Sequence, residues 1–227
     1  MKYHPLRLLQ ISALLLLGAG FYWPVLSFLS GSNPLHPEES FLQGEFFLDF
    51  LSDPWNLRVI AFSLFQALLS AVLSILVGLP GAWLLTHYNF PGQRWFRLLT
   101  YLPFILPSIL VVLAMVLFFG NNGWINRGLM ALFGTEEPPV LFLYSLSGIL
   151  IAHVFYNFPI AMKIIGDQWE RISEQYLQAA RSLGAGNMKR YFRITLPLLL
   201  PSIGSAFVLI FILCMNSFAI ILVLGGG

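Results

Sequence analysis

The polar side chains with the greatest capacity for chemistry lie within long apolar stretches. His153 and Asn157 are four positions apart, so on a helix they would share one face. Asn216 and Ser217 form a second polar pair near the end of the sequence. Two interpretations stay open for these four residues. They line a path for a solute, or they make hydrogen bonds between helices, and the second is favoured.

The residue types required for other chemistry are missing or isolated in the sequence. His153 has no second His, Asp or Glu in the same or a neighbouring apolar stretch, so we expect no metal site. Cys214 is the only cysteine, which excludes an intrachain disulfide and a zinc site built from cysteines. No phosphate-cradling P-loop, Ser-His-Asp arrangement or HExxH motif stands out. We therefore expect no enzyme active site and no cofactor on this chain.

The second informative stretch is a polar loop at residues 166–195, which reads GDQWERISEQYLQAARSLGAGNMKRYFRIT. Ser173 is a good N-cap, and Gly184 and Gly186 suit a left-handed helix stop. Asn187 can begin another helix, so the loop predicts a helix, a glycine turn and a second helix. It is either a docking surface for another protein or a helix lying on lipid headgroups. The predicted apolar stripe of the first helix comprises Ile172, Tyr176, Ala180 and Leu183.

Composition places these features in a membrane. The chain has 227 residues, of which 58% are hydrophobic and 10% charged, and its mean hydropathy is +0.79. A soluble domain carries about 25% charged residues, so we exclude a soluble globular enzyme and a disordered tail. The net charge of +2 is too small for nucleic-acid binding through bulk electrostatics. Five uncharged runs predict membrane-spanning helices: Leu8–Leu29, Val59–Leu85, Leu98–Phe119, Val140–Met162 and Leu196–Leu224.

The distribution of basic residues predicts that the N-terminus is cytoplasmic, because Lys and Arg accumulate in cytoplasmic loops. In this orientation only Arg58 and Arg127 lie outside, and loop 166–195 lies inside. The chain stops at Gly225–Gly227 directly after an apolar run, so we expect further spans to follow. We divide the sequence into residues 1–56 (first span and periplasmic segment) and 57–227 (transmembrane core). The inside Lys and Arg are Lys2, Arg7, Arg94, Arg97, Lys163, Arg171, Arg181, Lys189, Arg190 and Arg193.

The order of residues in loop 166–195 resembles the EAA motif of ABC importer permeases. The matching positions are Gln178-Ala179-Ala180, then Gly184, and nine residues later Ile194-Thr195-Leu196-Pro197. Gln178 stands where that family usually has Glu. The resemblance implies that this loop couples the spans to a cytoplasmic ATPase. The implied coupling residues are Gln178, Ala179, Ala180 and Gly184, with Ile194 and Pro197 as structural support.

Three other stretches, Phe62–Leu73, Gly148–Ala161 and Ser217–Gly227, are similar to the N-terminal half of fused permeases for thiamine or ferric iron. The thiamine permeases look more similar, mainly through residues 153–159. The resemblance implies an all-α integral membrane protein of the bacterial inner membrane with a MetI-like permease core, whose six-helix half is represented here by five helices. It implies three protein partners: a cytoplasmic ABC ATPase dimer holding ATP and Mg, a periplasmic solute-binding protein, and a second permease half.

Two alternatives to an ATP-driven importer stay open. A secondary transporter driven by an ion gradient is disfavoured, because the five runs contain no Asp, Glu, Lys or Arg, whereas intramembrane charges usually mark ion pathways. A structural membrane anchor is the weaker alternative. Uptake that survives an uncoupler while ATP is maintained would favour the importer.

Overall fold

The computed structural model describes residues 12–16, 18–23, 48 and 50–225. The chain divides into two compact units, Met1–Ala61 and Phe62–Gly227. In the first unit, residues 12–16 are α-helical and Gly18–Tyr22 form the π-helix η1. Half of the first predicted span, Leu8–Leu29, lies outside the described residues. The second unit holds the residues that the sequence singles out.

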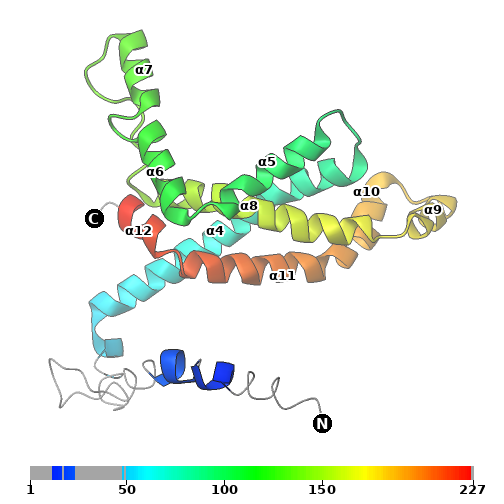
Figure 1. Cartoon of the computed structure of the whole chain (residues 1–227). Coiled ribbons are helices and arrows are strands. Elements are labelled where there is room, and N and C mark those ends of the chain that lie inside the picture. Colours follow the sequence, from blue (N-terminus) through cyan, green and yellow to red (C-terminus); the bar gives the residue numbers. More distant parts are fainter. Residues whose placement is uncertain (1–11, 17, 24–47, 49, 226–227) are drawn as a thin grey trace. The chain divides into compact units, whose positions relative to one another are not determined.

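Helices make up the described structure, and four of them are long and apolar enough to cross a membrane (Figure 1). These are Pro54–His87, Ser108–Phe133, Leu146–Glu170 and Asn187–Met215, where the second and the fourth join consecutive helical segments. The prediction of an all-α membrane protein is confirmed. The helices that lie wholly or mostly in the second unit are α4 (Pro54–His87), α5 (Gln93–Ile105), α6 (Ser108–Phe119), α7 (Trp124–Phe133), α8 (Leu146–Glu170), α9 (Glu174–Ser182), α10 (Asn187–Arg190), η2 (Tyr191–Thr195), α11 (Leu196–Met215) and α12 (Phe218–Leu224).

The third predicted span is wrong as a single helix. Leu98–Phe119 is divided between α5 and α6, because Leu106 is extended with φ −74° and ψ 143°. A proline disfavours the helical conformation of the residue before it, and Pro107 follows Leu106 directly. Pro80 and Pro201 lie inside the continuous helices α4 and α11.

Two other predicted boundaries also move. The fourth run begins at Val140, but α8 begins only at Leu146 and extends to Glu170. The fifth run, Leu196–Leu224, is interrupted at Asn216 and Ser217, where the backbone leaves the helix before α12 begins. The runs are defined by the absence of charge, which carries no signal for these boundaries, although the second break coincides with the polar pair Asn216 and Ser217.

Small residues allow α4 to approach α8 closely. A Cβ atom added to Gly78 would lie 2.7 Å from the Cβ of Ala161 and 2.9 Å from the carbonyl oxygen of Phe158. Ala71 and Ala82 of α4 are also buried. Small residues at helix contacts are the usual means of close packing in membranes. They allow α4, α8 and α11 to share one apolar core (Figure 1).

A second apolar cluster joins α6, α8 and α12. Val112 and Met115 of α6 pack with Ile149 of α8 and with Ile220 and Leu224 of α12. Helix α8 contributes to both clusters, so it is the central helix of the unit. Large apolar side chains elsewhere on these helices are exposed in this chain, as lipid-facing or partner-facing side chains would be.

Candidate functional site

The coupling segment, which we define as residues 171–195, begins at a capped helix. The side chain of Ser173 accepts a hydrogen bond from the backbone N–H of Gln175 (3.3 Å), so the predicted N-cap is confirmed. Such a cap satisfies one of the free N–H groups at the start of α9. Helix α9 is therefore a defined element, separated from the end of α8 by three residues.

Gly184 closes α9 in a Schellman motif. Its φ is +76°, a value that glycine adopts without strain. The N–H of Ala185 donates to the carbonyl oxygen of Ala180 (3.0 Å), and the N–H of Gly184 donates to that of Arg181 (2.9 Å). This pair of bonds is the signature of the motif. The predicted left-handed stop is confirmed at Gly184 and wrong at Gly186, whose φ is −66°.

The pattern of burial on α9 differs from the predicted apolar stripe. Ala180 is buried against the rest of the unit, whereas Tyr176 is exposed and Leu183 is 88% exposed. Gln178 and Ala179 are exposed as well. The four residues of the predicted stripe therefore do not share a buried face. The outward surface of α9 is instead partly apolar and has room for another protein.

The end of the coupling segment runs directly into a membrane helix. Helix α10 begins at Asn187, as predicted, and continues through the π-helix η2 into α11. Ile194 is half-buried in η2, and Pro197 lies at the start of α11. Because the helix is continuous there, Pro197 removes one backbone hydrogen bond that the N–H of another residue would donate. The helical segment from α10 to the end of α11 is therefore continuous.

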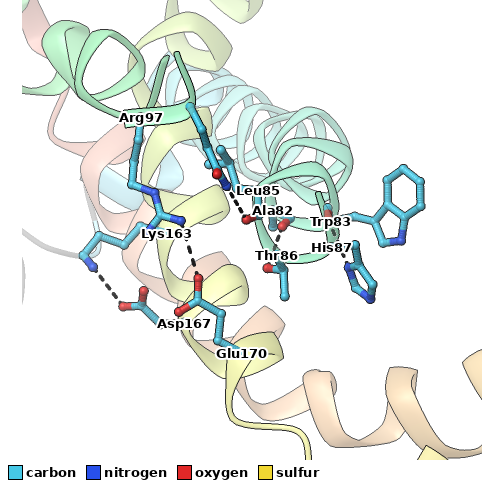
Figure 2. Close-up of polar contacts among 10 residues, drawn as sticks. Ala82, Trp83, Leu85, Thr86, His87, Arg97, Lys163, Asp167 and Glu170 are labelled. Carbon is cyan, nitrogen blue, oxygen red and sulfur yellow. Dashed lines mark hydrogen bonds and ion pairs between the residues drawn. The ribbon is translucent and has the colours of Figure 1, made fainter. Parts of the chain in front are cut away.

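Two ion pairs lie where α4, α5 and α8 meet, one between α5 and α8 and one within α8. Arg97 of α5 lies 3.5 Å from Glu170 of α8, and Lys163 lies 2.9 Å from Asp167 one turn along α8 (Figure 2). All four side chains are partly exposed. Exposed pairs contribute at most about 1 kcal/mol each, so their main effect is to neutralise the two acids of α8.

His153 and Asn157 are buried and bonded to neighbouring helices. Nδ1 of His153 and the hydroxyl of Ser70 on α4 form a hydrogen bond of 3.0 Å. The side-chain amide of Asn157 donates to Sγ of Cys214 on α11 (3.4 Å). Both contacts are interhelical hydrogen bonds of the kind favoured from the sequence. Each joins segments that are more than fifty residues apart in the chain.

The other predicted polar pair is placed differently. Asn216 is exposed, and its side chain donates to the carbonyl oxygen of Ile212 (2.9 Å). Ser217 is half-buried at the break between α11 and α12. The structure therefore does not gather the four predicted residues into one patch. Whether they line a solute path stays a prediction.

Several buried polar atoms have no hydrogen-bond partner among the described residues. They are Gln66 Oε1, Ser74 Oγ, His153 Nε2, Asn157 Oδ1, Ser217 Oγ and Arg190 Nε. Unpartnered buried polar groups are uncommon in proteins. Five of the six atoms belong to helices α4 and α8 or to the turn before α12, which are the elements that surround the two interhelical bonds. Within the described part of the chain, no three His, Cys, Asp or Glu side chains gather as metal ligands would.

The sequence did not indicate the burial of the Asn126 side chain, which holds the loop between α7 and α8. Asn126 lies in α7 and is completely buried. Its side-chain amide donates to the carbonyl oxygens of Gly120 (2.9 Å) and Val140 (2.8 Å), and its Oδ1 accepts from the N–H of Val140 (2.9 Å). The burial of Arg190 was missed too.

The long apolar helices define a multi-pass membrane protein. Hydrogen bonds join these helices in the interior, and a capped helix is exposed on a connecting segment. The chain belongs to the family described as "Binding-protein-dependent transport system inner membrane component", which matches residues 71–227. It is thus an importer permease component, and the resemblance stated from the sequence is confirmed. This family comprises transport subunits.

Curated relatives include thiamine permeases. The thiamine transport system permease protein ThiP of Haemophilus influenzae is 37% identical over 176 residues, which cover 78% of this chain and 32% of that protein. ThiP of Brucella abortus (strain 2308) is 35% identical, with 77% of this chain and 32% of the relative covered. A probable sulfate transport system permease protein cysT of Helicosporidium sp. subsp. Simulium jonesii is 30% identical. The match covers 79% of this chain and 64% of that protein. The chain spans about a third of the length of the thiamine permeases.

Solved structures share the fold. A chain of a bacterial ABC transporter involved in the import of the acidic polysaccharide alginate superposes with a TM-score of 0.70 at 17% identity, covering 92% of this chain and 72% of that one. The same transporter in complex with an alginate pentasaccharide-bound periplasmic protein gives a TM-score of 0.68. At this identity the likeness concerns the arrangement of helices alone.

Proposed function

We propose that this chain is part of the permease of an ATP-driven importer, with the coupling segment docking on a separate ATPase. The observation that carries the proposal is the fold of the matched motif. Gln178 and Ala179 are exposed, Gly184 closes the helix, and Leu183 presents a large apolar side chain to solvent. Exposed apolar side chains on a capped helix are typical of a helix-in-groove contact.

The ATPase supplies the energy in this proposal. ATP and Mg bind to the partner, arranged as a dimer on the cytoplasmic side, and this chain contributes no cofactor. The N-terminus is cytoplasmic, as the distribution of Lys and Arg predicts. The continuous path from α10 through η2 into α11 carries the motion of the docked helix to the membrane. A second permease half completes the solute pathway.

Thiamine is the proposed solute, delivered by a periplasmic binding protein. The support is the identity of 34–37% to several thiamine permeases, and one structural neighbour holds a periplasmic protein. Ferric iron is the alternative cargo. A probable sulfate permease is also among the relatives, at 30% identity.

The docking proposal is tested by charging the outward surface of α9. Leu183→Asp leaves the fold intact, because Leu183 is 88% exposed, and it places a hydrated carboxylate in an apolar contact. We expect loss of ATPase co-purification with the assembled importer. Trp95→Asp is the matched control, since Trp95 is 71% exposed in the first turn of α5, outside the coupling segment and the four membrane-spanning helices, and we expect normal co-purification. Equal retention of the ATPase by both variants would overturn the docking role.

The energy source and the solute are tested in cells that carry the whole importer. We expect thiamine uptake to continue with an uncoupler when ATP is maintained, and to stop when ATP is depleted. Uptake abolished by the uncoupler under maintained ATP would instead indicate an ion-gradient carrier. Deletion of the gene separates the two cargoes. Only an iron importer would lose uptake of labelled ferric iron, and only a thiamine importer would lose uptake of labelled thiamine.

A further inference from the structure

A second candidate site lies between the coupling segment and the membrane helices. It is a pocket of about 640 Å³ lined from α4, α8, α9, α10 and η2. Its aromatic wall is continuous: His87 meets Trp169 edge to face with ring centroids 5.4 Å apart, and Trp169 meets Tyr191 at 6.3 Å. Trp83 lies 5.7 Å from His87 on the same wall.

A buried cation lies in this pocket. Arg190 is only 9% exposed, and one of its Nη atoms donates to the side-chain oxygen of Asn187. Its Nε is buried and has no hydrogen-bond partner among the described residues. A buried charge is costly unless an opposite charge and hydrogen bonds compensate it. An amide oxygen satisfies one donor and supplies no negative charge.

The acids nearby are turned to the other side of α8. None of the residues that line the pocket is acidic, and Arg181 adds a second guanidinium. Glu170 is paired with Arg97, and Asp167 with Lys163. Figure 2 shows these four side chains on one side of the end of α4, with Trp83 and His87 on the other. The pocket therefore has a positive charge that the described side chains do not neutralise.

We propose that this pocket binds a phosphate group, held by Arg190 and Arg181 against the aromatic wall. Arginine matches the geometry of phosphate oxygens with paired N–H donors. Tryptophan and tyrosine concentrate at the membrane surface, and basic pockets at the cytoplasmic ends of spans hold lipid headgroups. The phosphate belongs either to an anionic lipid or to a soluble phosphate ester. The bound phosphate would bridge α4 and α8 to the coupling segment. The location of the pocket on the cytoplasmic side is the one part of this inference that rests on the proposed function.

Binding is measured by tryptophan fluorescence of the assembled importer, since Trp83 and Trp169 line the pocket. The probes are short-chain phosphatidylglycerol and glycerol phosphate, with short-chain phosphatidylcholine for comparison. We expect a saturable change that Arg190→Gln weakens about tenfold or more, as expected for loss of a charge-assisted hydrogen bond. Arg193→Gln is the matched control, because Arg193 is exposed on η2 and does not line the pocket.

The outcomes separate the sources of phosphate. Saturation by phosphatidylglycerol alone assigns a lipid, and saturation by both anionic probes assigns a soluble phosphate ester. If Arg190→Gln fails to assemble, the exposed Arg181→Gln replaces it, with the same expected loss. Two results would overturn the proposal. In the first, no probe gives a saturable change, as expected if a carboxylate of the docked ATPase pairs with Arg190. In the second, both pocket variants bind the probes like wild type. The readout requires no transport, so its failure leaves the importer proposal untouched.

Discussion

The hydroxyl of Ser70 lies 3.0 Å from Nδ1 of His153, and this hydrogen bond joins α4 to α8 inside the apolar core. Both side chains are fully buried. Hydrogen bonds between membrane helices contribute about 0.6 kcal/mol on average and up to about 2. The contact is therefore a measurable part of the α4–α8 interface.

Ser70→Ala is expected to lower the free energy of unfolding by about 0.6–2 kcal/mol, because the buried imidazole loses its hydrogen-bond partner. Thermal or denaturant unfolding in detergent measures the change. Ser205→Ala is the control, since Ser205 is exposed and bonds only to the carbonyl oxygen of Pro201 in its own helix. Equal losses in the two variants would show that the interhelical bond contributes nothing.

Gly78→Ala is expected to destabilise the protein by about 1–3 kcal/mol through overpacking. The added Cβ would lie 2.7 Å from that of Ala161 and 2.9 Å from a backbone oxygen, so α4 and α8 must separate. Gly204→Ala serves as its control, because nothing lies within 4 Å of a Cβ placed there. Unfolding midpoints of both variants test this, and an unchanged midpoint for Gly78→Ala contradicts the close approach.

Gly184→Ala is expected to cost about 1–2 kcal/mol, since a residue with a Cβ is strained in the left-handed region. The loss should appear as fraying of α9, measured by hydrogen exchange of the amides of Gly184 and Ala185. Gly186→Ala gives the comparison, as its φ is −66° and its surroundings are open. If the amides of both variants remain equally protected, the Schellman closure does not hold the helix.

Asn126→Ala is expected to cost about 2–4 kcal/mol, because it removes three hydrogen bonds and leaves buried backbone groups unpaired. The loop between α7 and α8 should become sensitive to protease. Asn122→Ala, at an exposed neighbouring position, should leave the cleavage rate unchanged. A resistant Asn126→Ala loop would mean that the amide does not tie the loop down.

Much of the coupling segment could be predicted from its sequence. The cap at Ser173, the stop at Gly184 and the start at Asn187 depend on local backbone preferences, which act over a few residues. The faces of α9 could not be predicted in this way. Ala180 is buried and Leu183 is exposed, in contrast with their hydrophobicity, because burial depends on which neighbouring helix is present.

The sequence by itself determined that this is a membrane protein of helices, because the bilayer requires long uncharged runs and each run satisfies its own backbone hydrogen bonds. It also determined the family, through the spacing from Gln178 to Pro197. Only the tertiary structure decided which polar groups meet. Ser70 reaches His153 across 83 positions, and Arg190 lines one pocket together with aromatic side chains of α4 and α8. Such contacts arise when separate helices pack, and helical periodicity specifies only which residues share a face.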